Sequence, residues 1–560
     1  MNPMKRLFHF APFVAGTCLL CASASAANPY LPLWEYIPDG EPYVFEDPDR
    51  PGQFRVYIYG SHDIEISAYC GRNQVVWSAP VDDLSHWRFD GMIFESRFDA
   101  LGRPLNADGR ADILYAPDVT EKVGPDGKKT YYLYPNTQAD GRRSIIARAD
   151  RPDGPFTVCN WDPKDPTRTV GPMGFDPAAF IDDDGRVYGY WGFQESWGAE
   201  LDPETMCTVK KGTQPVKDMV SSCKQDGVFR FFEASSIRKV KDKYIFVYSR
   251  VTAEGEFGLP AANGNLAWAW SNHPLGPWTY GGTLIDARAR VRDAEGNTIV
   301  TAAPGGNTHG GLCEIGGQWY IFYHRQTGLG GFDRQAMVAP VEVKVTEGPD
   351  GKVEISEAEY TSEGFELRGL NPRERHSAGI ACWFTGPRPA EKDGLGNKYS
   401  GSYVQPYRPA WDGISDPYDL RINHNPVVNN TAGSVVGYKY FNFNLLRPQL
   451  AKSLRPRLMA DRLLVRLVPQ GVRGRIVIMA DAPSAGQGGI RLGVIRLSGR
   501  EPQESVEKLA RLRKVNGLWD KHALFFVFES RTPGRSLCEL EDFVFVSRSQ
   551  LANAEKEQPL

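Results

Sequence analysis

The chain has 560 residues, 12% of them aromatic, and a formal net charge of −3. A charge so close to zero over this length gives no basis for binding nucleic acid or another polyanion. Glycine (57 residues) and proline (41 residues) are frequent, which is typical of short strands joined by tight turns. The length is enough for two or three domains.

Residues 1–26 have the pattern of an export signal. The basic segment MNPMKR precedes the apolar segment LFHFAPFVAGTCLLCA, and ASASAA then offers small residues for cleavage. Cys21 leaves a lipoprotein signal as an alternative, but Leu20 does not match the small residue expected before it. No later apolar run is long enough to span a bilayer. We therefore expect cleavage after Ala26 and a periplasmic or secreted protein with no membrane span.

Seven cysteines follow this cleavage site without forming a CxxC pair, so a structural zinc site is not expected. An exported protein can form disulfides. Cys207 and Cys223 are the candidate pair, across the loop TVKKGTQPVKDMVSS, and buried free thiols are the alternative.

A two-strand pattern recurs five times between residues 28 and 370. Each copy has an extended segment that begins near a polar residue, followed by an aromatic strand such as RVYIYGSHD, TYYLYPN or KYIFVYSR. A third element also recurs, as ARADRPDGPF and AWSNHPLGPW. Self-similar antiparallel units of this size predict an all-β fold that begins with a five-bladed β-propeller.

The five copies begin with an acid or a histidine at the same position: Asp39, Asp118, Asp176, Glu233 and His309. Any one of them alone would be interpreted as a solvated turn residue. In a propeller, however, the innermost strand of each blade lines the central channel, so equivalent residues should converge on one axial pocket. Phe231 and Phe232 precede Glu233 and would limit water around its carboxyl group.

Several acids in one pocket cannot all ionise easily, because like charges push their pKa values apart. The result is one proton donor and one base, as glycosidic bond cleavage requires. Aromatic side chains suit the C–H faces of a sugar; the candidates are Trp34, Tyr59, Trp87 and Trp191, although most tryptophans here are expected to pack between blades.

The same ring of oxygen ligands would suit calcium. No DxDxDG-type loop is present, and IDDDGRVYG is better interpreted as a hairpin turn. A single axial calcium ion or water site beside His309 is therefore the candidate metal site. The chemistry itself requires no cofactor.

Three segments resemble glycoside hydrolase family 43: NPYLPLWEYIPDGEPYVF, FDPAAFIDDDGRVYGYWG and FFEASSIRKVKDKYIFVYS. This resemblance implies that Asp39 is the general base, Asp176 the residue that adjusts the pKa of the acid, and Glu233 the general acid. It also places His309 on the axis. It further implies that Asp118 and Arg325 lie near the substrate. The chain departs from the family pattern in PDGEP, which adds Glu41, and in EASS after the acid.

The resemblance implies an exo-acting, inverting enzyme that removes terminal pentoses, α-L-arabinofuranosyl or β-D-xylosyl, from plant-type polysaccharides or oligosaccharides. An inverting pair has its carboxyl groups about 6.5–9.5 Å apart. A β-D-galactofuranosidase or galactosidase of the same family is the alternative, and a non-catalytic propeller lectin is the alternative of another class. Fructosidase boxes (NDPNG) and sialidase Asp-boxes are absent from the sequence.

Residues 375–546 keep a strand-like alternation but lose the blade spacing, which predicts a β-sandwich. The segment containing GYKYFNF resembles carbohydrate-binding module family 6, and a structural buttress without a sugar site is the alternative. Residues 547–560 form a polar tail. We expect a monomer whose partner is its oligosaccharide or polysaccharide substrate.

Overall fold

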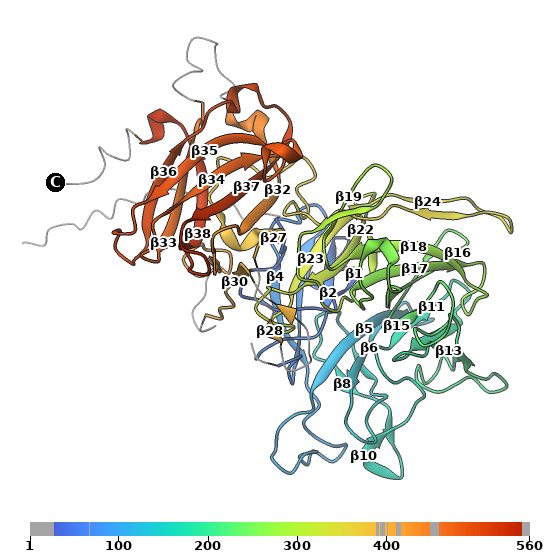
Figure 1. Ribbon diagram of the computed structural model, residues 1–560. Coiled ribbons are helices and arrows are strands. Elements are labelled where there is room, and N and C mark those ends of the chain that lie inside the picture. Colours follow the sequence, from blue (N-terminus) through green and yellow to red (C-terminus); the bar gives the residue numbers. More distant parts are fainter. Residues whose placement is uncertain are drawn as a thin grey trace, which may run out of the picture.

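The computed structural model describes residues 27–65, 68–387, 391–392, 398–399, 401–409, 416–447 and 459–551. The predicted signal segment and residues 552–560 of the predicted tail lie outside the described residues. Strands and short 3-10 turns dominate the described chain, and they form two domains side by side (Figure 1). The expected all-β fold class is therefore confirmed. No helix in the described ranges has the length and hydropathy that crossing a bilayer requires.

The first domain has five antiparallel sheets whose strands follow one another in chain order. The first blade contains β1 (Glu41–Glu46), β2 (Phe54–Tyr59), β3 (Gln74–Pro80) and β4 (Arg88–Phe94). The second contains β5 (Leu114–Val123), β6 (Lys129–Thr137), β7 (Ala147–Ala149) and β8 (Thr157–Val158). The third contains β11 (Ala178–Ile181), β12 (Val187–Trp191), β13 (Trp197–Leu201) and β14 (Val216–Lys217).

The fourth blade contains β15 (Phe231–Val240), β16 (Lys243–Arg250), β17 (Asn265–Ser271) and β18 (Thr279–Asp286). The fifth has three strands, β21 (Leu312–Ile315), β22 (Gln318–Arg325) and β23 (Gln335–Val341). Asn28 completes its outer edge: its side chain donates to the Val338 carbonyl at 2.6 Å and accepts from the Val338 amide at 2.9 Å. The start of the described chain thus closes the last blade.

The first strand of each blade faces the axis, because β1 contacts both β5 and β21, and β11 contacts both β5 and β15. Hairpins extend from this ring. They are β9 (Trp161–Asp162) with β10 (Asp165–Thr169), β19 (Arg290–Arg292) with β20 (Thr298–Thr301), and β24 (Val343–Val345) with β25 (Val353–Ile355). A short 3-10 turn, η1 (Glu256–Gly258), follows β16.

The second domain packs two sheets face to face. One contains β26 (His376–Ser377), β30 (Tyr403–Val404), β31 (Val427–Val428), β33 (Arg462–Pro469), β36 (Val506–Arg511) and β38 (Cys538–Val546). The other contains β27 (Trp383–Thr385), β32 (Val435–Asn442), β34 (Gly474–Ala480), β35 (Ile490–Leu497) and β37 (Lys521–Ser530). Short 3-10 turns are η2 (Ala378–Ile380), η3 (Phe443–Leu446), η4 (Ala485–Gln487) and η5 (Val515–Gly517). The small pair β28 (Glu391–Lys392) and β29 (Lys398–Tyr399) lies apart from both sheets.

Successive side chains of a strand point to opposite faces of its sheet, so the five-stranded sheet packs on the sandwich core with one face and on the propeller with the other. On β37, Phe526 and Phe528 point into the sandwich core, whereas Ala523 and Phe525 belong to a cluster shared with the propeller residues Trp268 and Tyr323. The two domains are therefore joined by a hydrophobic contact rather than by a linker alone. In the described part of the chain Cys207 and Cys223 are free thiols, so the candidate disulfide is not formed.

Candidate active site

A cavity of about 320 Å³ opens at one end of the propeller axis. Four of the five residues that begin the repeated units line it: Asp39, Asp176, Glu233 and His309. They come from four blades, at or just before the inner strands β1, β11, β15 and β21. The repeat thus brings together side chains that are up to 270 residues apart in the sequence.

Asp39 is held by three neighbours. Arg334 Nη1 donates to its Oδ1 at 3.0 Å, the Ser61 hydroxyl donates to its Oδ2 at 2.6 Å, and His324 Nδ1 lies 3.2 Å from Oδ1. Burial acts to raise the pKa of Asp39, but Arg334 and His324 outweigh it and hold this pKa well below its usual range. Asp39 is therefore an ionised carboxylate at neutral pH.

Glu233 has the opposite character. No hydrogen bond joins its carboxyl group to another described residue, and the aromatic ring of Phe232 lines the pocket beside it. Burial first, and then the negative charge of Asp39, raise the pKa of Glu233 to about 8, although Arg334 acts against this. Phe231 is buried in the blade core, so only one of the two expected phenylalanines lines the pocket.

Asp176 joins the two neighbouring blades. Its Oδ1 accepts from Asn136 Nδ2 and its Oδ2 accepts from the Ala234 amide, both at 3.0 Å. Burial first, and then the negative charges of Glu233 and Asp39, raise the pKa of Asp176. Because Asp176 holds the amide of the residue next to Glu233, it fixes the position of the Glu233 backbone.

The backbone is strained at these positions. Asp39, Asp176 and Ala234 have φ values of 59°, 47° and 70°, in a region that residues other than glycine rarely adopt. Such conformations persist only where the surrounding structure enforces them, and they concentrate at functional sites. Here the side-chain hydrogen bonds of the two aspartates supply that enforcement.

Below the pocket, His309 and Glu41 face each other across the axis. His309 Nε2 and Glu41 Oε1 are 4.0 Å apart, and neither atom has a hydrogen-bond partner among the described residues. The other Glu41 oxygen accepts from Arg238 Nη2 at 2.9 Å and from the Ser236 hydroxyl at 3.1 Å. Glu41 and Ser236 belong to the two segments in which the sequence departs from the family pattern, and they meet here.

The residues around His309 do not match the ligand set of a calcium site. Calcium takes six to eight oxygen ligands, whereas no group of three or more His, Cys, Asp or Glu residues in the described ranges is arranged to hold a metal ion. Arg238 supplies a fixed positive charge at Glu41. The described residues therefore do not form a calcium cage, and no step of the chemistry is assigned to a metal.

Aromatic side chains form one wall of the pocket. Tyr115, Phe175, Phe193 and Phe232 line it in sequence, with neighbouring ring centroids 6.1, 5.1 and 5.1 Å apart. Tyr69 also lines the pocket. The Arg334 guanidinium carbon lies over its ring, 4.9 Å from the ring centroid. This wall offers the apolar surface on which the C–H face of a sugar can rest.

Five residues expected to contact substrate lie elsewhere. Trp34 and Tyr59 are buried in blade cores, where they donate to the carbonyls of Pro417 and Pro152. Trp191 stacks on Trp197 with its ring centroid 6.3 Å away. These expectations are corrected: β2 directs Tyr59 and β12 directs Trp191 into blade cores, and the turn before β1 places Trp34 in the core of the first blade. Trp87, also named as a candidate, packs in the same core as Trp34.

Asp118 and Arg325 were also expected near the substrate, and neither lines the pocket. Asp118 lies deeper in the channel, where Tyr43 Oη and the Ala179 amide donate to it at 2.6 and 2.7 Å. Arg325 is buried, and it donates to Gln335 Oε1 and to the carbonyls of Gly379 and Ala381. Arg325 therefore connects the last blade to the second domain rather than reaching the pocket.

Arg334 is the important residue that sequence reasoning missed. It is 2% exposed, and besides Asp39 it donates from Nε and Nη2 to the two oxygens of Asp63, each at 2.9 Å. It lies just before β23, outside the repeated positions. Part of the aromatic wall could have been predicted from the sequence, because Phe175 and Phe232 each directly precede one of the pocket acids.

Glycosidic bond hydrolysis requires one carboxyl group that donates a proton and another that is ionised, and the pocket contains such a pair. The model of Glycosyl hydrolases family 43 matches residues 52–348, more than half of the chain. The protein belongs to this family, and it is a glycoside hydrolase of the xylosidase/arabinosidase type.

The chain is similar to several known proteins. A xylosidase/arabinosidase from Thermoclostridium stercorarium is 36% identical over 434 residues, which cover 74% of this chain and 82% of that protein. Xylosidase/arabinosidase 43A from Humicola insolens is 27% identical over 48% of this chain and 84% of its own length. A solved family 43 arabinoxylan arabinofuranohydrolase from Bacillus subtilis, in complex with cellotetraose, is 20% identical with a TM-score of 0.43, covering 94% of this chain and 98% of that one.

Proposed function

We propose that this protein is an exo-acting, inverting glycosidase that removes terminal α-L-arabinofuranosyl or β-D-xylosyl residues from plant-type polysaccharides or oligosaccharides. The observation that carries the proposal is that two carboxyl groups with opposite surroundings share one cavity: Asp39 is bound by Arg334 and Ser61, whereas Glu233 has no hydrogen-bond partner among the described residues. These surroundings move their pKa values in opposite directions. At about 320 Å³ the cavity lies near the lower limit of ligand pockets, which suits one terminal sugar unit.

In this mechanism Glu233 donates its proton to the glycosidic oxygen as the bond to the anomeric carbon breaks. Asp39 accepts a proton from the water that attacks the same carbon from the opposite face. The released sugar therefore has the inverted anomeric configuration. Arg334 keeps Asp39 ionised, and Asp176 positions the backbone beside Glu233.

A panel of p-nitrophenyl glycosides tests the substrate. We expect cleavage of the α-L-arabinofuranoside, the β-D-xyloside or both, with release of single sugars from arabinoxylan. Preferred cleavage of the β-D-galactofuranoside or galactoside would replace the pentose assignment with the alternative named from the sequence. Release of longer oligosaccharides from the polymer would contradict the exo mode. Export and cleavage after Ala26 stay predictions, which N-terminal sequencing of the mature protein would test.

A further inference from the structure

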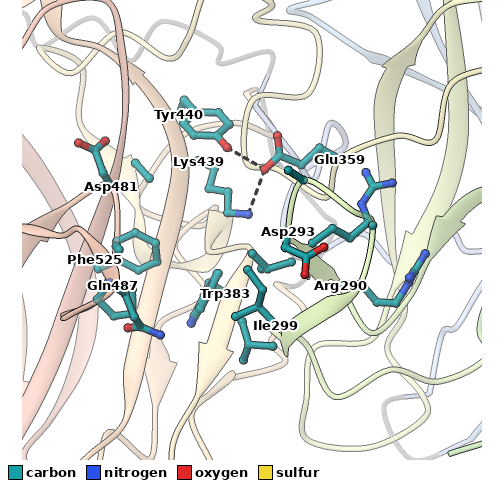
Figure 2. Close-up of a pocket in the computed structure, with 18 residues that line it drawn as sticks. Arg290, Asp293, Ile299, Glu359, Trp383, Lys439, Tyr440, Asp481, Gln487 and Phe525 are labelled. Atoms are coloured by element: carbon teal, nitrogen blue, oxygen red, sulfur yellow. Dashed lines mark hydrogen bonds and ion pairs between the residues drawn. The ribbon is translucent and has the colours of Figure 1, made fainter. Parts of the chain in front are cut away.

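A second cavity, of about 800 Å³, lies between the propeller and the sandwich (Figure 2). The hairpin β19–β20 forms one side, including Ile299, which is 61% exposed. The outward face of the sheet with β27, β32 and β37 forms the other, through Trp383, Tyr440 and Phe525. Neither domain alone could form this cavity, because each contributes only one wall.

The sandwich wall combines aromatic rings with polar groups. Trp383 packs edge to face on Phe525, with ring centroids 5.2 Å apart, and the Lys439 ammonium group lies 5.3 Å from the Trp383 ring. Tyr440 is half-buried, and its hydroxyl donates to Glu359 Oε1 at 2.7 Å. Apolar surface with a few convergent polar groups is the usual composition of a binding site for an organic ligand.

Several polar atoms at this cavity retain unused hydrogen-bonding capacity. Both Lys439 Nζ and the Tyr440 hydroxyl bond to Glu359 Oε1, so Glu359 Oε2 accepts no bond from a described residue. The side-chain oxygen of Gln487 accepts from the Ser484 hydroxyl, and its side-chain nitrogen has no partner in the described chain. A ligand with many hydroxyl groups could both donate to and accept from such groups.

The charges indicate a neutral ligand. The lining contains three cations, Arg290, Arg292 and Lys439, and three anions, Asp293, Glu359 and Asp481. Both arginines are already engaged by Glu357, at 2.7 and 2.6 Å, and Lys439 is engaged by Glu359 at 3.1 Å. Because the charges of the lining balance and its three cations are each paired with a carboxylate, the cavity favours an uncharged chain over an anionic one.

The cavity is also linked to the catalytic pocket through the chain itself. Val300 lines the interdomain cavity and Asn307, seven residues later, lines the catalytic pocket. Seven extended residues span at most about 25 Å. The part of the cavity beside Val300 therefore lies within that distance of the catalytic pocket, so one polymer chain long enough to span it could occupy both sites.

We propose that the interdomain cavity is a second, non-catalytic site that binds a neutral polysaccharide chain, and thereby increases the affinity of the enzyme for polymeric substrate. The inference rests on the proposed glycosidase function, since it assigns the polymer backbone to this cavity and the cleaved unit to the pocket.

The test measures binding without turnover, in the Glu233→Gln background. Affinity electrophoresis in gels that contain soluble arabinoxylan would compare this protein with Ile299→Arg, which narrows the cavity, and with Tyr440→Ala, which removes a ring from its wall. We expect each change to weaken retardation at least fivefold. Leu509→Arg is the matched control, because Leu509 is also an exposed aliphatic residue, at 48%, on β36 of the opposite sheet.

Unchanged retardation of Ile299→Arg, no retardation of the Glu233→Gln parent, or equal retardation by polygalacturonate would overturn the proposal. In the active background, Ile299→Arg should leave kcat/KM on the p-nitrophenyl glycoside within twofold of the parent. The two proposals fail separately. If retardation depends on Ile299 but no pentoside is cleaved, the cavity assignment stands and the substrate assignment fails.

Discussion

Arg334 donates to Asp39 Oδ1 at 3.0 Å and binds both oxygens of Asp63 with the rest of its guanidinium group. This one residue lowers the pKa of Asp39 and also acts to lower the pKa of Glu233. Both limbs of the pH profile therefore depend on it: activity requires Asp39 ionised at the acidic limb and Glu233 protonated at the basic limb.

For the parent enzyme we expect kcat/KM to remain high from mildly acidic pH and to fall above about pH 8, where Glu233 loses its proton. Arg334→Lys keeps a positive charge but loses the fork that binds two carboxylates. Both pKa values should then rise, so both limbs should move to higher pH with a lower maximum. A pH profile of kcat/KM measures this, and unmoved limbs would show that Arg334 has only a structural role.

Glu233→Gln removes the proton donor while keeping the shape of the side chain. We expect kcat on an oligosaccharide to fall by about 10²–10⁴, the usual contribution of general acid catalysis. The loss should be much smaller with a 2,4-dinitrophenyl glycoside, because that leaving group needs little protonation. Asp39→Asn should be impaired on both substrates, since attack by water is impaired in either case; equal losses for Glu233→Gln on both would contradict the acid role.

The sign of the stability effect also follows from the raised pKa of Glu233. A carboxyl group whose folded-state pKa exceeds its unfolded value destabilises the fold progressively as the pH rises above the unfolded value of about 4.3. Glu233→Gln should therefore raise the melting temperature, and by more at pH 8 than at pH 5. Calorimetry at the two pH values measures it, and an equal or lower melting temperature at pH 8 would count against a raised pKa.

The stereochemistry of the product distinguishes the two arrangements of paired carboxyl groups. With Asp39 as base and Glu233 as acid, the first sugar released should have the inverted anomeric configuration. Proton NMR of the anomeric signal during the first minutes, before mutarotation, measures this. Release of the retained anomer would mean that Asp39 attacks carbon directly, which requires a carboxyl separation of about 5 Å instead of 6.5–9.5 Å.

The sequence predicted the residues whose position repeats. Asp39, Asp176, Glu233 and His309 occupy equivalent places in their blades and line one pocket, whereas Asp118, at the fifth such place, does not line it. Trp34, Tyr59 and Trp191 were chosen by residue type, and all three are packed in blade cores. An aromatic residue type does not by itself show whether the side chain faces the pocket or the core of a blade.

Other features depend on contacts that no local pattern specifies. Arg334 and Phe193 lie in segments between strands, outside the repeated positions, and tertiary packing places them at the pocket. In the sandwich, β38 pairs with β26, β31 and β33, which lie far from it in sequence. Alternation predicted strands there, but it could not predict their order, nor the cavity that the second domain forms with β19–β20.

Glu41 and Arg238 form a buried ion pair that connects the first and fourth blades below the catalytic pocket. Arg238 also donates to the carbonyls of Pro42 and Leu312, at 3.0 and 2.8 Å. Removing one partner of a buried pair leaves the other charge uncompensated, at a cost of about 3–5 kcal/mol. We therefore expect Arg238→Met to lower the melting temperature markedly.

A double variant distinguishes the contribution of the ion pair to stability from the contribution of the packing of Arg238. Glu41→Gln/Arg238→Met leaves no unpaired charge, so it should recover part of the loss, with a coupling energy of about 0.5–3 kcal/mol. Burial raises the pKa of Glu41, while Arg238 acts to lower it. In the parent this pKa is about 7, and without Arg238 it should be higher still. Both proteins therefore lose stability alike from about pH 4 to 7, and the deficit of Arg238→Met should grow between about pH 7 and 9, where only the folded parent ionises Glu41. Thermal unfolding of the single and double variants across this range measures both effects; additive losses that do not change with pH would show that the arginine contributes packing alone.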